Sequence, residues 1–170
     1  AWVGTGLHTV QSIFNFGQRA FAYTPPSGFL ALNTQNLPTP TIKKPSSYFD
    51  ASLYTGNGGS AVTTVTNSGF QPSLVWLKAR SSAYDHKLVD SVRGASGGIY
   101  YDLQSNSSGA ESLPTAGITS LTSNGFTISA ATNNGYNGNG TTFVAWQWQK
   151  SATPGFDIVT YTGDGTGTRN

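Results

Sequence analysis

Cysteine and methionine are both absent from this chain of 170 residues. Without cysteine, a disulfide framework, a thiolate metal site and a cysteine nucleophile are all excluded. Charged residues are scarce too, at 9% of the chain against about a quarter of an average soluble domain. The formal net charge is +2, and the one basic run is Lys43-Lys44. Because a nucleic-acid-binding surface needs far more basic residues, we expect no nucleic-acid partner.

Long apolar runs are also missing from the sequence. No stretch approaches the roughly 20 consecutive apolar residues of a membrane-spanning helix, so we expect no membrane insertion. The chain does contain 36% hydrophobic and 12% aromatic residues, together with 21 glycines and many Ser, Thr and Asn residues. These apolar side chains suffice for the core of a domain of about 100 residues. We expect a folded protein whose surface is hydrated through hydroxyls and amides.

Strand patterns dominate the sequence. Val144, Trp146 and Trp148 alternate with their neighbours, which predicts a strand whose heavily apolar face they form. Residues 126–129 alternate likewise, and residues 74–77 are apolar on both faces, as is typical of a central strand. Five Asn-Gly pairs predict tight turns, and no segment has the pattern of a long amphipathic helix. We therefore expect an all-β fold, a β-sandwich or jelly roll.

The large aromatic residues are predicted to fill the core of this fold. Each Trp buries on the order of 200 Å², and a domain of this size needs several such side chains. Trp148, nearest the end of its strand, is the one expected to be partly exposed. The predicted core aromatics are Trp76, Phe126, Phe143, Trp146 and Trp148.

One motif occurs twice. Residues 49–58 read Phe-Asp-Ala-Ser-Leu-Tyr-Thr-Gly-Asn-Gly, and residues 156–165 read Phe-Asp-Ile-Val-Thr-Tyr-Thr-Gly-Asp-Gly, 107 residues later. A fixed period predicts an array of modules, so we interpret the chain as a window of a longer protein. The predicted parts are the end of a preceding domain (1–37), a Pro-rich linker (38–47), a complete module (48–150), a second linker (151–155) and the start of a further repeat (156–170).

The sequence also resembles known β-sandwich families. Residues 14–21 and 23–33 resemble the closing strand and tail of a SPRY-like domain of the concanavalin A-like class. Residues 70–78, 88–95 and 143–148, with Asp85-His86, Glu111 and residues 121–126, are similar to a second β-sandwich family that often follows it in virion proteins of marine bacteriophages. The resemblance implies tandem concanavalin A-like modules.

What the resemblance implies about function is a virion structural protein, such as a tail fibre or other appendage, located on the surface of the particle. Its implied partners are other virion proteins and further copies of itself, a trimer being one arrangement. It implies no catalytic residue, cofactor or metal. Three alternatives stay open: a bacterial extracellular adhesin, a module that binds or degrades polysaccharide, and a capsid-decorating protein.

The densest group of ionisable residues is Asp85, His86, Asp90, Arg93 and Glu111. A functional interpretation would make it a metal site or an acid/base pair, with Asp90 and Glu111 as the two carboxylates of a polysaccharide hydrolase. The structural interpretation, which we favour, is that Asp90 and Arg93 tie a turn to a neighbouring strand and that Glu111 accepts from a remaining donor. One histidine alone makes a weak zinc site.

The loop at residues 132–141 is the predicted contact with host surface glycans. Sugars are bound by an aromatic face and by amides that meet their hydroxyls, and Tyr136 lies among Asn134, Asn137 and Asn139. The alternative is a hairpin connection in which Tyr136 folds back onto the domain.

Overall fold

The computed structural model describes residues 13–165. The chain divides into two compact units, Ala1–Pro40 and Thr41–Asn170. In the first unit, the described residues contain one short 3-10 turn, η1 (Thr34–Asn36), and no strand. The closing strand predicted for residues 14–21 is therefore not formed. A strand needs a neighbour to pair its backbone groups, and the described part of this unit offers none.

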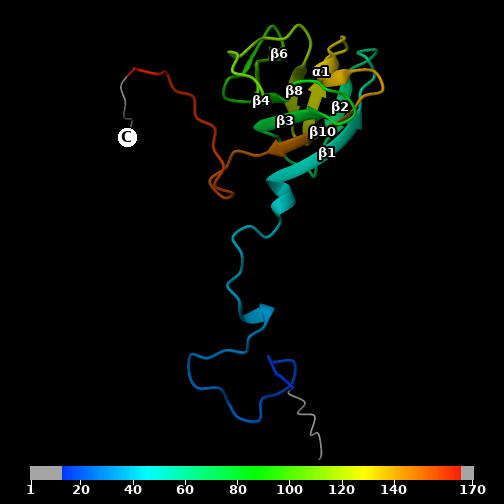
Figure 1. Ribbon diagram of the computed structural model, residues 1–170. Coiled ribbons are helices and arrows are strands. Elements are labelled where there is room, and N and C mark those ends of the chain that lie inside the picture. The colour runs from blue at the N-terminus through cyan, green and yellow to red at the C-terminus, as the bar shows by residue number, and fades with distance from the viewer. Residues whose placement is uncertain (1–12, 166–170) are drawn as a thin grey trace, which may run out of the picture. The chain divides into compact units, whose positions relative to one another are not determined.

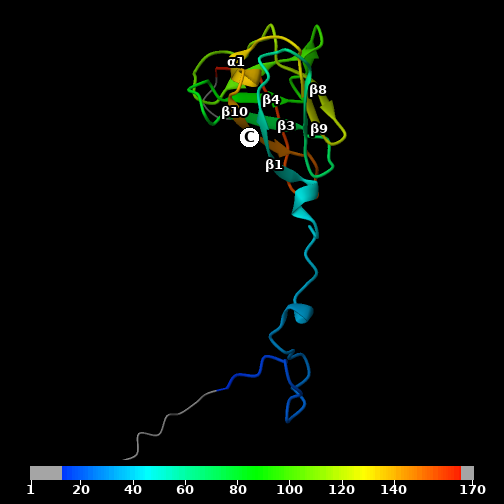
Figure 2. The same ribbon diagram turned by 90° about the vertical axis from the view of Figure 1, so that its right-hand side faces the viewer.

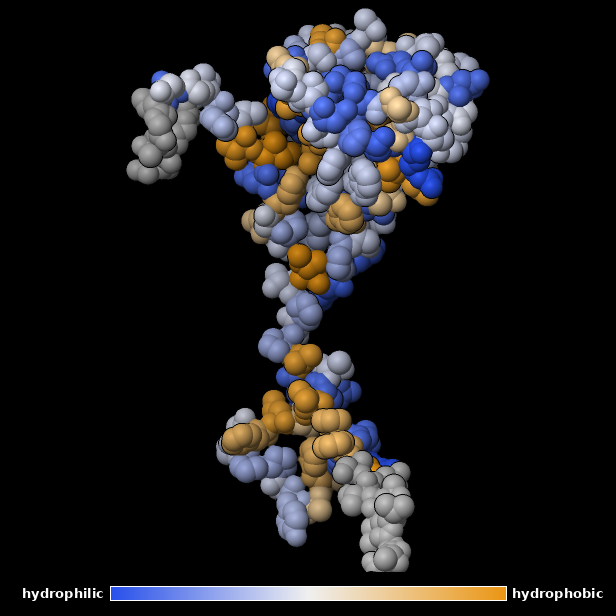
Figure 3. All heavy atoms as spheres, in the orientation of Figure 1, coloured by the Kyte–Doolittle hydropathy of each residue, from blue (hydrophilic) through white to orange (hydrophobic). Residues whose placement is uncertain are grey.

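The described part of the first unit, residues 13–40, also buries little of its apolar surface. Phe14, Tyr23 and Leu30 are among its many exposed large side chains. Figure 3 shows this as a large share of orange atoms among its described residues. Its local order comes from short-range polar contacts, such as the Asn33 side chain that accepts a hydrogen bond from the backbone N–H of Gln35.

The second unit contains all the strands of the described chain. They are β1 (Phe49–Thr55), β2 (Thr63–Thr66), β3 (Leu74–Ala79), β4 (Lys87–Asp90), β5 (Ala95–Ser96), β6 (Ile99–Tyr100), β7 (Asp102–Gln104), β8 (Ile118–Thr122), β9 (Gly125–Ile128) and β10 (Thr142–Trp148). Two short helical segments accompany them, η2 (Pro45–Ser47) and α1 (Asn134–Asn137). The fold is all-β, as predicted.

The strands form antiparallel sheets. One sheet has five strands in the order β1-β10-β3-β4-β7, a second has three in the order β2-β9-β8, and β5 and β6 form a small hairpin. Figures 1 and 2 show β1, β10, β3 and β4 running side by side, with β1 at one edge. The central position predicted for residues 74–77 is confirmed, because β3 has a neighbour on each side.

Both larger sheets contribute side chains to one hydrophobic core. The five-stranded sheet supplies alternate residues of its strands, since successive side chains of a strand point to opposite faces. We call the face that carries these residues the inner face, and the opposite one the outer face. The core consists of Val75, Leu77 and Ala79 of β3, Val89 of β4, Phe143 and Ala145 of β10, Val65 of β2, Ile118 and Leu121 of β8, Phe126 and Ile128 of β9, and Tyr136 of α1.

The predicted placement of the three tryptophans in the core is wrong. Phe126 and Phe143 are fully buried, as predicted. Trp76, Trp146 and Trp148 instead lie on the outer face and are partly exposed. They pack against aromatic neighbours across the strands, and the rings of Trp76 and Trp146 lie 5.4 Å apart between centroids. Among the tryptophans, only the partial exposure expected of Trp148 agrees with the structure.

Between Trp146 and Trp148, the residue that points to the inner face is Gln147, which is fully buried. Its side-chain nitrogen donates to the Ser52 hydroxyl at 2.9 Å, and its oxygen accepts from the Asn67 amide at 3.0 Å. A buried amide is tolerated when its donors and acceptors find partners. Two polar residues distant in sequence therefore allow this face of β10, with Phe143 and Ala145, to point into the core.

The Asn-Gly pairs adopt two kinds of structure. Gly58, Gly125 and Gly140 have positive φ, as the predicted turns require. The pairs that begin at Asn134 and Asn137 instead open and close α1. The one-turn helix forms because the Asn133 side chain accepts a hydrogen bond from the backbone N–H of Gly135.

Candidate functional site

The structure places the predicted glycan-contact residues in two environments. Tyr136 and Asn137 are fully buried, so the prediction that they contact an external ligand is wrong. Asn134 and Asn139 are exposed, and their contact with a glycan stays a prediction. Tyr136 turns inward because its ring joins the core and its hydroxyl finds a carboxylate there, which is the alternative that the sequence left open.

The partner of Tyr136 is Asp102, a buried carboxylate that the sequence reasoning missed. The Tyr136 hydroxyl donates to Asp102 Oδ2 at 2.7 Å, and Lys87 Nζ lies 3.2 Å from the same oxygen. The Ser112 hydroxyl donates to Asp102 Oδ1 at 2.7 Å. Burial, together with the negative charge of Asp102, raises the pKa of the Tyr136 hydroxyl far above its usual range. This network joins β4, β7 and α1, and its groups are occupied with one another.

Asp90 and Arg93 make the tie that the structural interpretation predicted. Asp90 Oδ1 accepts from the backbone N–H groups of Val92 and Arg93, and Arg93 Nε donates to Asp90 Oδ2 at 2.6 Å. Arg93 Nη2 donates to the carbonyl of Leu88 in β4. Glu111 Oε2 lies 3.7 Å from Nη1, close enough for an ion pair but too far for a hydrogen bond, so the prediction that Glu111 accepts from a remaining donor is wrong. Both oxygens of buried Asp90 are thus engaged, which argues against its use as an acid or base on a sugar.

Asp85 and His86 make separate contacts in the same region. Asn106 donates from its amide to Asp85 Oδ1 at 2.9 Å and accepts the backbone N–H of His86. These bonds fix the segment that enters β4. Across residues 13–165, no group of three or more potential metal-ligating His, Cys, Asp or Glu side chains comes together. The same residues contain no helix long and apolar enough to cross a membrane.

A hollow lined by aromatic residues lies where β1 begins and β10 ends. Because the two strands are antiparallel, Phe49 at the start of β1 pairs with Trp148 at the end of β10, and their rings lie 5.0 Å apart. The next residues turn back through an isolated bridge between Ser151 and Phe156. This return brings the Phe156 ring to 6.2 Å from that of Trp148, in a stacked arrangement.

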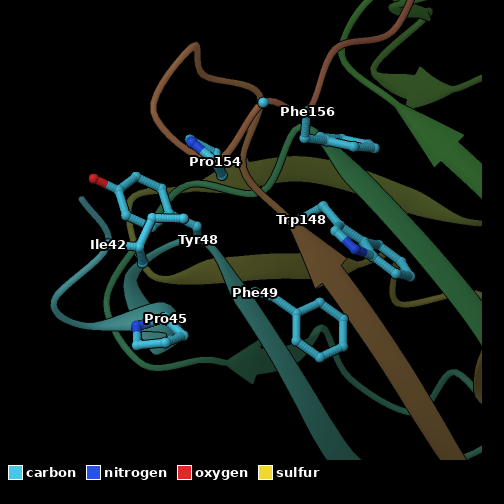
Figure 4. A pocket seen from close by; sticks show the side chains of 8 residues that line it. Ile42, Pro45, Tyr48, Phe49, Trp148, Pro154 and Phe156 are labelled. Carbon is cyan, nitrogen blue, oxygen red and sulfur yellow. The ribbon is translucent and has the colours of Figure 1, made fainter. Parts of the chain in front are cut away.

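These side chains surround a cavity of about 430 Å³, which we call the aromatic pocket. Its lining is almost wholly apolar, and the side chains that can form hydrogen bonds are Tyr48 and Trp148. Figure 4 shows Trp148 on β10 and Phe49 on β1 as the neighbouring rings of this pocket. The lining residues are Ile42, Pro45, Tyr48, Phe49, Trp148, Pro154, Gly155 and Phe156.

A more polar hollow adjoins the aromatic pocket and shares Gly155 and Phe156 with it. Its volume is about 400 Å³, and Lys150, Ser151 and Asp157 contribute to its lining. Lys150 Nζ lies 2.7 Å from Asp157 Oδ1. This hydrogen bond holds the pKa of the Asp157 carboxyl below its usual range. Aromatic faces and charged hydrogen-bonding groups therefore meet around one loop of seven residues, 149–155.

Sequence reasoning missed this pocket because its parts lie far apart in the chain and were assigned to other roles. Trp148 was assigned mainly to the core, and Ile42 and Pro45 to a linker. The available signal was that Phe49 and Phe156 occupy the first position of the two motif copies and that Trp148 precedes the second copy by a short loop.

Comparison with known proteins gives one family and no closer relative. No curated protein and no solved structure matches the chain. The family described as "Domain of unknown function (DUF7483)" matches residues 44–169, a range that contains both motif copies and the whole β-rich part. The chain therefore belongs to the DUF7483 family.

Proposed function

We propose that this chain is part of a bacteriophage virion protein, a tail-fibre or other appendage segment built of β-sandwich modules in tandem. The observation that carries the proposal is the return of the β1 motif at residues 156–165, which indicates a further module of the same kind. The resemblance to virion modules of marine bacteriophages points in the same direction. The core shared by the two larger sheets supports the sandwich architecture of a concanavalin A-like jelly roll.

In this proposal each module acts as a stiff spacer. The second unit has one continuous core and closely packed strands, while the segment before it is rich in proline. Few charged residues and many hydroxyls and amides suit a protein that faces water over its whole length. Further copies of the chain and other virion proteins are the proposed partners.

We assign the contact with host surface glycans to the aromatic pocket and its polar neighbour. Rings of Phe49, Trp148 and Phe156 offer apolar faces to a sugar. Lys150 and Asp157 are paired through one carboxylate oxygen, and the further N–H donors of the ammonium and the second carboxylate oxygen lie beside these rings. Such a contact is weak for a single module. An appendage that presents many copies would bind through avidity.

A glycan array with a multivalent display of the protein tests this assignment. We expect binding that Trp148→Ala weakens about tenfold or more, the effect of losing one aromatic contact of about 1.4 kcal/mol. Leu53→Ala is the matched control, since Leu53 is an apolar outer-face residue, 64% exposed, that does not line the pocket. Equal binding by both variants and the unchanged protein would rule the pocket out.

Electron microscopy of the particle that carries the chain tests the virion proposal itself. The expected image is a projecting multimeric rod in which β-rich units follow one another. A single domain outside any particle or filament would contradict it and would favour the adhesin or polysaccharide-binding alternatives.

A further inference from the structure

The second motif copy, residues 156–165, repeats the residues through which β1 binds the rest of its unit. Tyr54 of β1 stacks its ring on Phe143 of β10, with centroids 4.9 Å apart. Its hydroxyl donates to the backbone carbonyl of Tyr136 at 2.6 Å. The second copy carries Tyr161 at the same place. Each copy therefore carries a tyrosine at the position where Tyr54 anchors β1 to the core and to the α1 segment.

The acidic residue of the motif, Asp50, is also repeated in the second copy, as Asp157. Asp50 accepts hydrogen bonds from the backbone N–H and the hydroxyl of Ser68, at 2.7 and 2.6 Å, which ties the start of β1 to the turn after β2. Asp50 also accepts the N–H of the next residue at 2.7 Å, and Asp157 does the same with Ile158 at 2.7 Å. The second copy thus already has the local geometry of the first.

The two glycines are kept because β1 needs them. A side chain on Gly56 would collide with the carbonyl oxygen of Gly138, because this backbone lies directly against the loop that follows α1. Gly58 has a φ of +72°, and Gly165 has a φ of +75°. Gly163 stands at the place of Gly56 in the second copy. The repeated glycines therefore meet requirements of close packing and turn formation.

Four of the ten positions differ between the copies, and two of these four are positions that β1 does not use. Ala51 and Leu53 point to the outer face and are exposed, and the second copy replaces them by Ile158 and Thr160. The other two differences fall on residues that make contacts here. Ser52, which accepts a hydrogen bond from Gln147, corresponds to Val159, and Asn57, which accepts one from Asn137, corresponds to Asp164.

In the structure the second copy carries this set of residues without being a strand of the sheet. Residues 157–165 form no strand, and the side chains of Val159 and Tyr161 are 76% and 78% exposed. The edge of its own β10 is already occupied, since β1 pairs with it from Phe49 opposite Trp148 to Thr55 opposite Thr142. The surface that fits residues 156–165 is consequently the same edge on another copy of this fold.

We propose that residues 156–165 form the first strand of a second copy of this fold, in which they dock on the strand equivalent to β10 in the register that β1 uses here. Tyr161 then packs on the equivalent of Phe143, and Gly163 lies against the equivalent of Gly138. This inference rests on the proposed tandem array and names the contact that begins each further unit.

The test uses the full chain, kept intact through Gly165 and extended by a second copy of residues 59–150. Hydrogen exchange is followed by mass spectrometry on peptides from residues 156–165, which occur once in the extended chain. We expect protection of these amides to rise roughly 100-fold over the original chain, since they enter a paired strand. Tyr161→Ala should abolish the gain, whereas Thr160→Ala, at the exposed place of Leu53, should keep it.

Two outcomes would overturn the proposal. In the first, residues 156–165 are protected in the original chain while β1 exchanges freely, which would mean that they displace β1 on their own sheet. In the second, they stay unprotected in the extended chain.

A companion chain, in which residues 156–165 are replaced by the exact sequence of residues 49–58, separates the reasons for a failure. If the added second unit folds in this companion but not with the natural residues 156–165, those residues cannot serve as the first strand. If the added second unit folds in neither chain, a second unit cannot begin at this junction, and the proposal is equally overturned. Images of the particle and glycan binding do not depend on this result, so failure of the strand proposal is distinguishable from failure of the virion proposal.

Discussion

The two motif copies share six of their ten residues and have different structures. Residues 49–55 run as β1 along the edge of the five-stranded sheet, with Tyr54 in contact with the core. Residues 157–165 form no strand, and Tyr161 is mostly exposed. Both copies nevertheless share the hydrogen bond from the Asp side chain to the next N–H and the positive φ of the last glycine.

The comparison separates local from long-range causes of structure. A hydrogen bond to the next residue and a glycine turn need no partner, so both copies have them. A strand needs a second strand that pairs its backbone groups and a core that buries its inward side chains. For β1 these come from β10 and Phe143, which lie about 90 residues further along the chain.

The largest expected difference between the copies concerns their tyrosines. Tyr54→Ala should lower the free energy of unfolding by about 3 kcal/mol, because it removes a partly buried ring that packs on the core and its hydrogen bond to the Tyr136 carbonyl. Tyr161→Ala should change it by less than about 0.5 kcal/mol, since that side chain is 78% exposed. Urea denaturation of both variants measures this, and equal losses would show that the second copy is already part of the folded unit.

The glycines provide the next comparison. Gly56→Ala should destabilise the protein by about 1–3 kcal/mol, because its Cβ collides with the backbone of Gly138 and the loop must shift. Gly163→Ala is the matched control, since nothing lies within 4 Å of its Cβ position. Thermal unfolding of the two variants checks the prediction. A Gly56→Ala variant with unchanged stability would mean that the loop after α1 can move to accommodate the added methyl group at no cost.

Substitutions of the two phenylalanines should affect stability about equally, unlike those of the tyrosines and glycines, because both rings contact Trp148. Phe49→Ala and Phe156→Ala should each cost about 0.5–1.5 kcal/mol of stability, as expected for the loss of one aromatic pair. Denaturation followed by tryptophan fluorescence reports directly on this site. A loss confined to Phe49→Ala would show that the contact between Phe156 and Trp148 does not contribute to stability.

The smallest expected effect depends on pH. The hydrogen bond from the Ser68 hydroxyl holds the pKa of Asp50 below its ordinary value of 3.8. Because the folded-state pKa is the lower one, this contribution is present above pH 3.8 and is lost as the pH falls through the folded-state pKa. It amounts to at most about 1 kcal/mol, since the site is close to solvent.

The matching experiment compares urea denaturation at pH 5 and pH 3 for the unchanged protein and for Ser68→Ala. We expect a smaller loss of stability on acidification in Ser68→Ala, whose Asp50 keeps only its backbone donors. Asp157→Asn, in the exposed second copy, should affect the pH dependence less than Asp50→Asn does. A larger effect of Asp157→Asn than of Asp50→Asn on the pH dependence of stability would place the acid-sensitive contact in the second copy.

Much of the fold could be predicted from the sequence. The alternation in residues 126–129 and the apolar run at residues 74–77 identified β9 and the central strand β3, because period-2 patterns depend only on neighbouring residues. The Asp90–Arg93 tie was also predicted, since the two residues lie within one turn and in a chain poor in charge. The site residues Tyr136 and Asn137 were misplaced because their partners, Asp102 and Asn57, lie far away in sequence.

The sequence by itself indicated the strands β3, β9 and β10, three of the five Asn-Gly turns and the presence of two motif copies, because these follow from side-chain type and local spacing. The tertiary structure decided which face of each strand is buried. In β10 it placed Gln147 inside and the tryptophans outside, because Ser52 and Asn67 satisfy the buried amide. It also decided that one copy of the motif is a strand and the other is not, since pairing depends on an edge that only one copy can occupy.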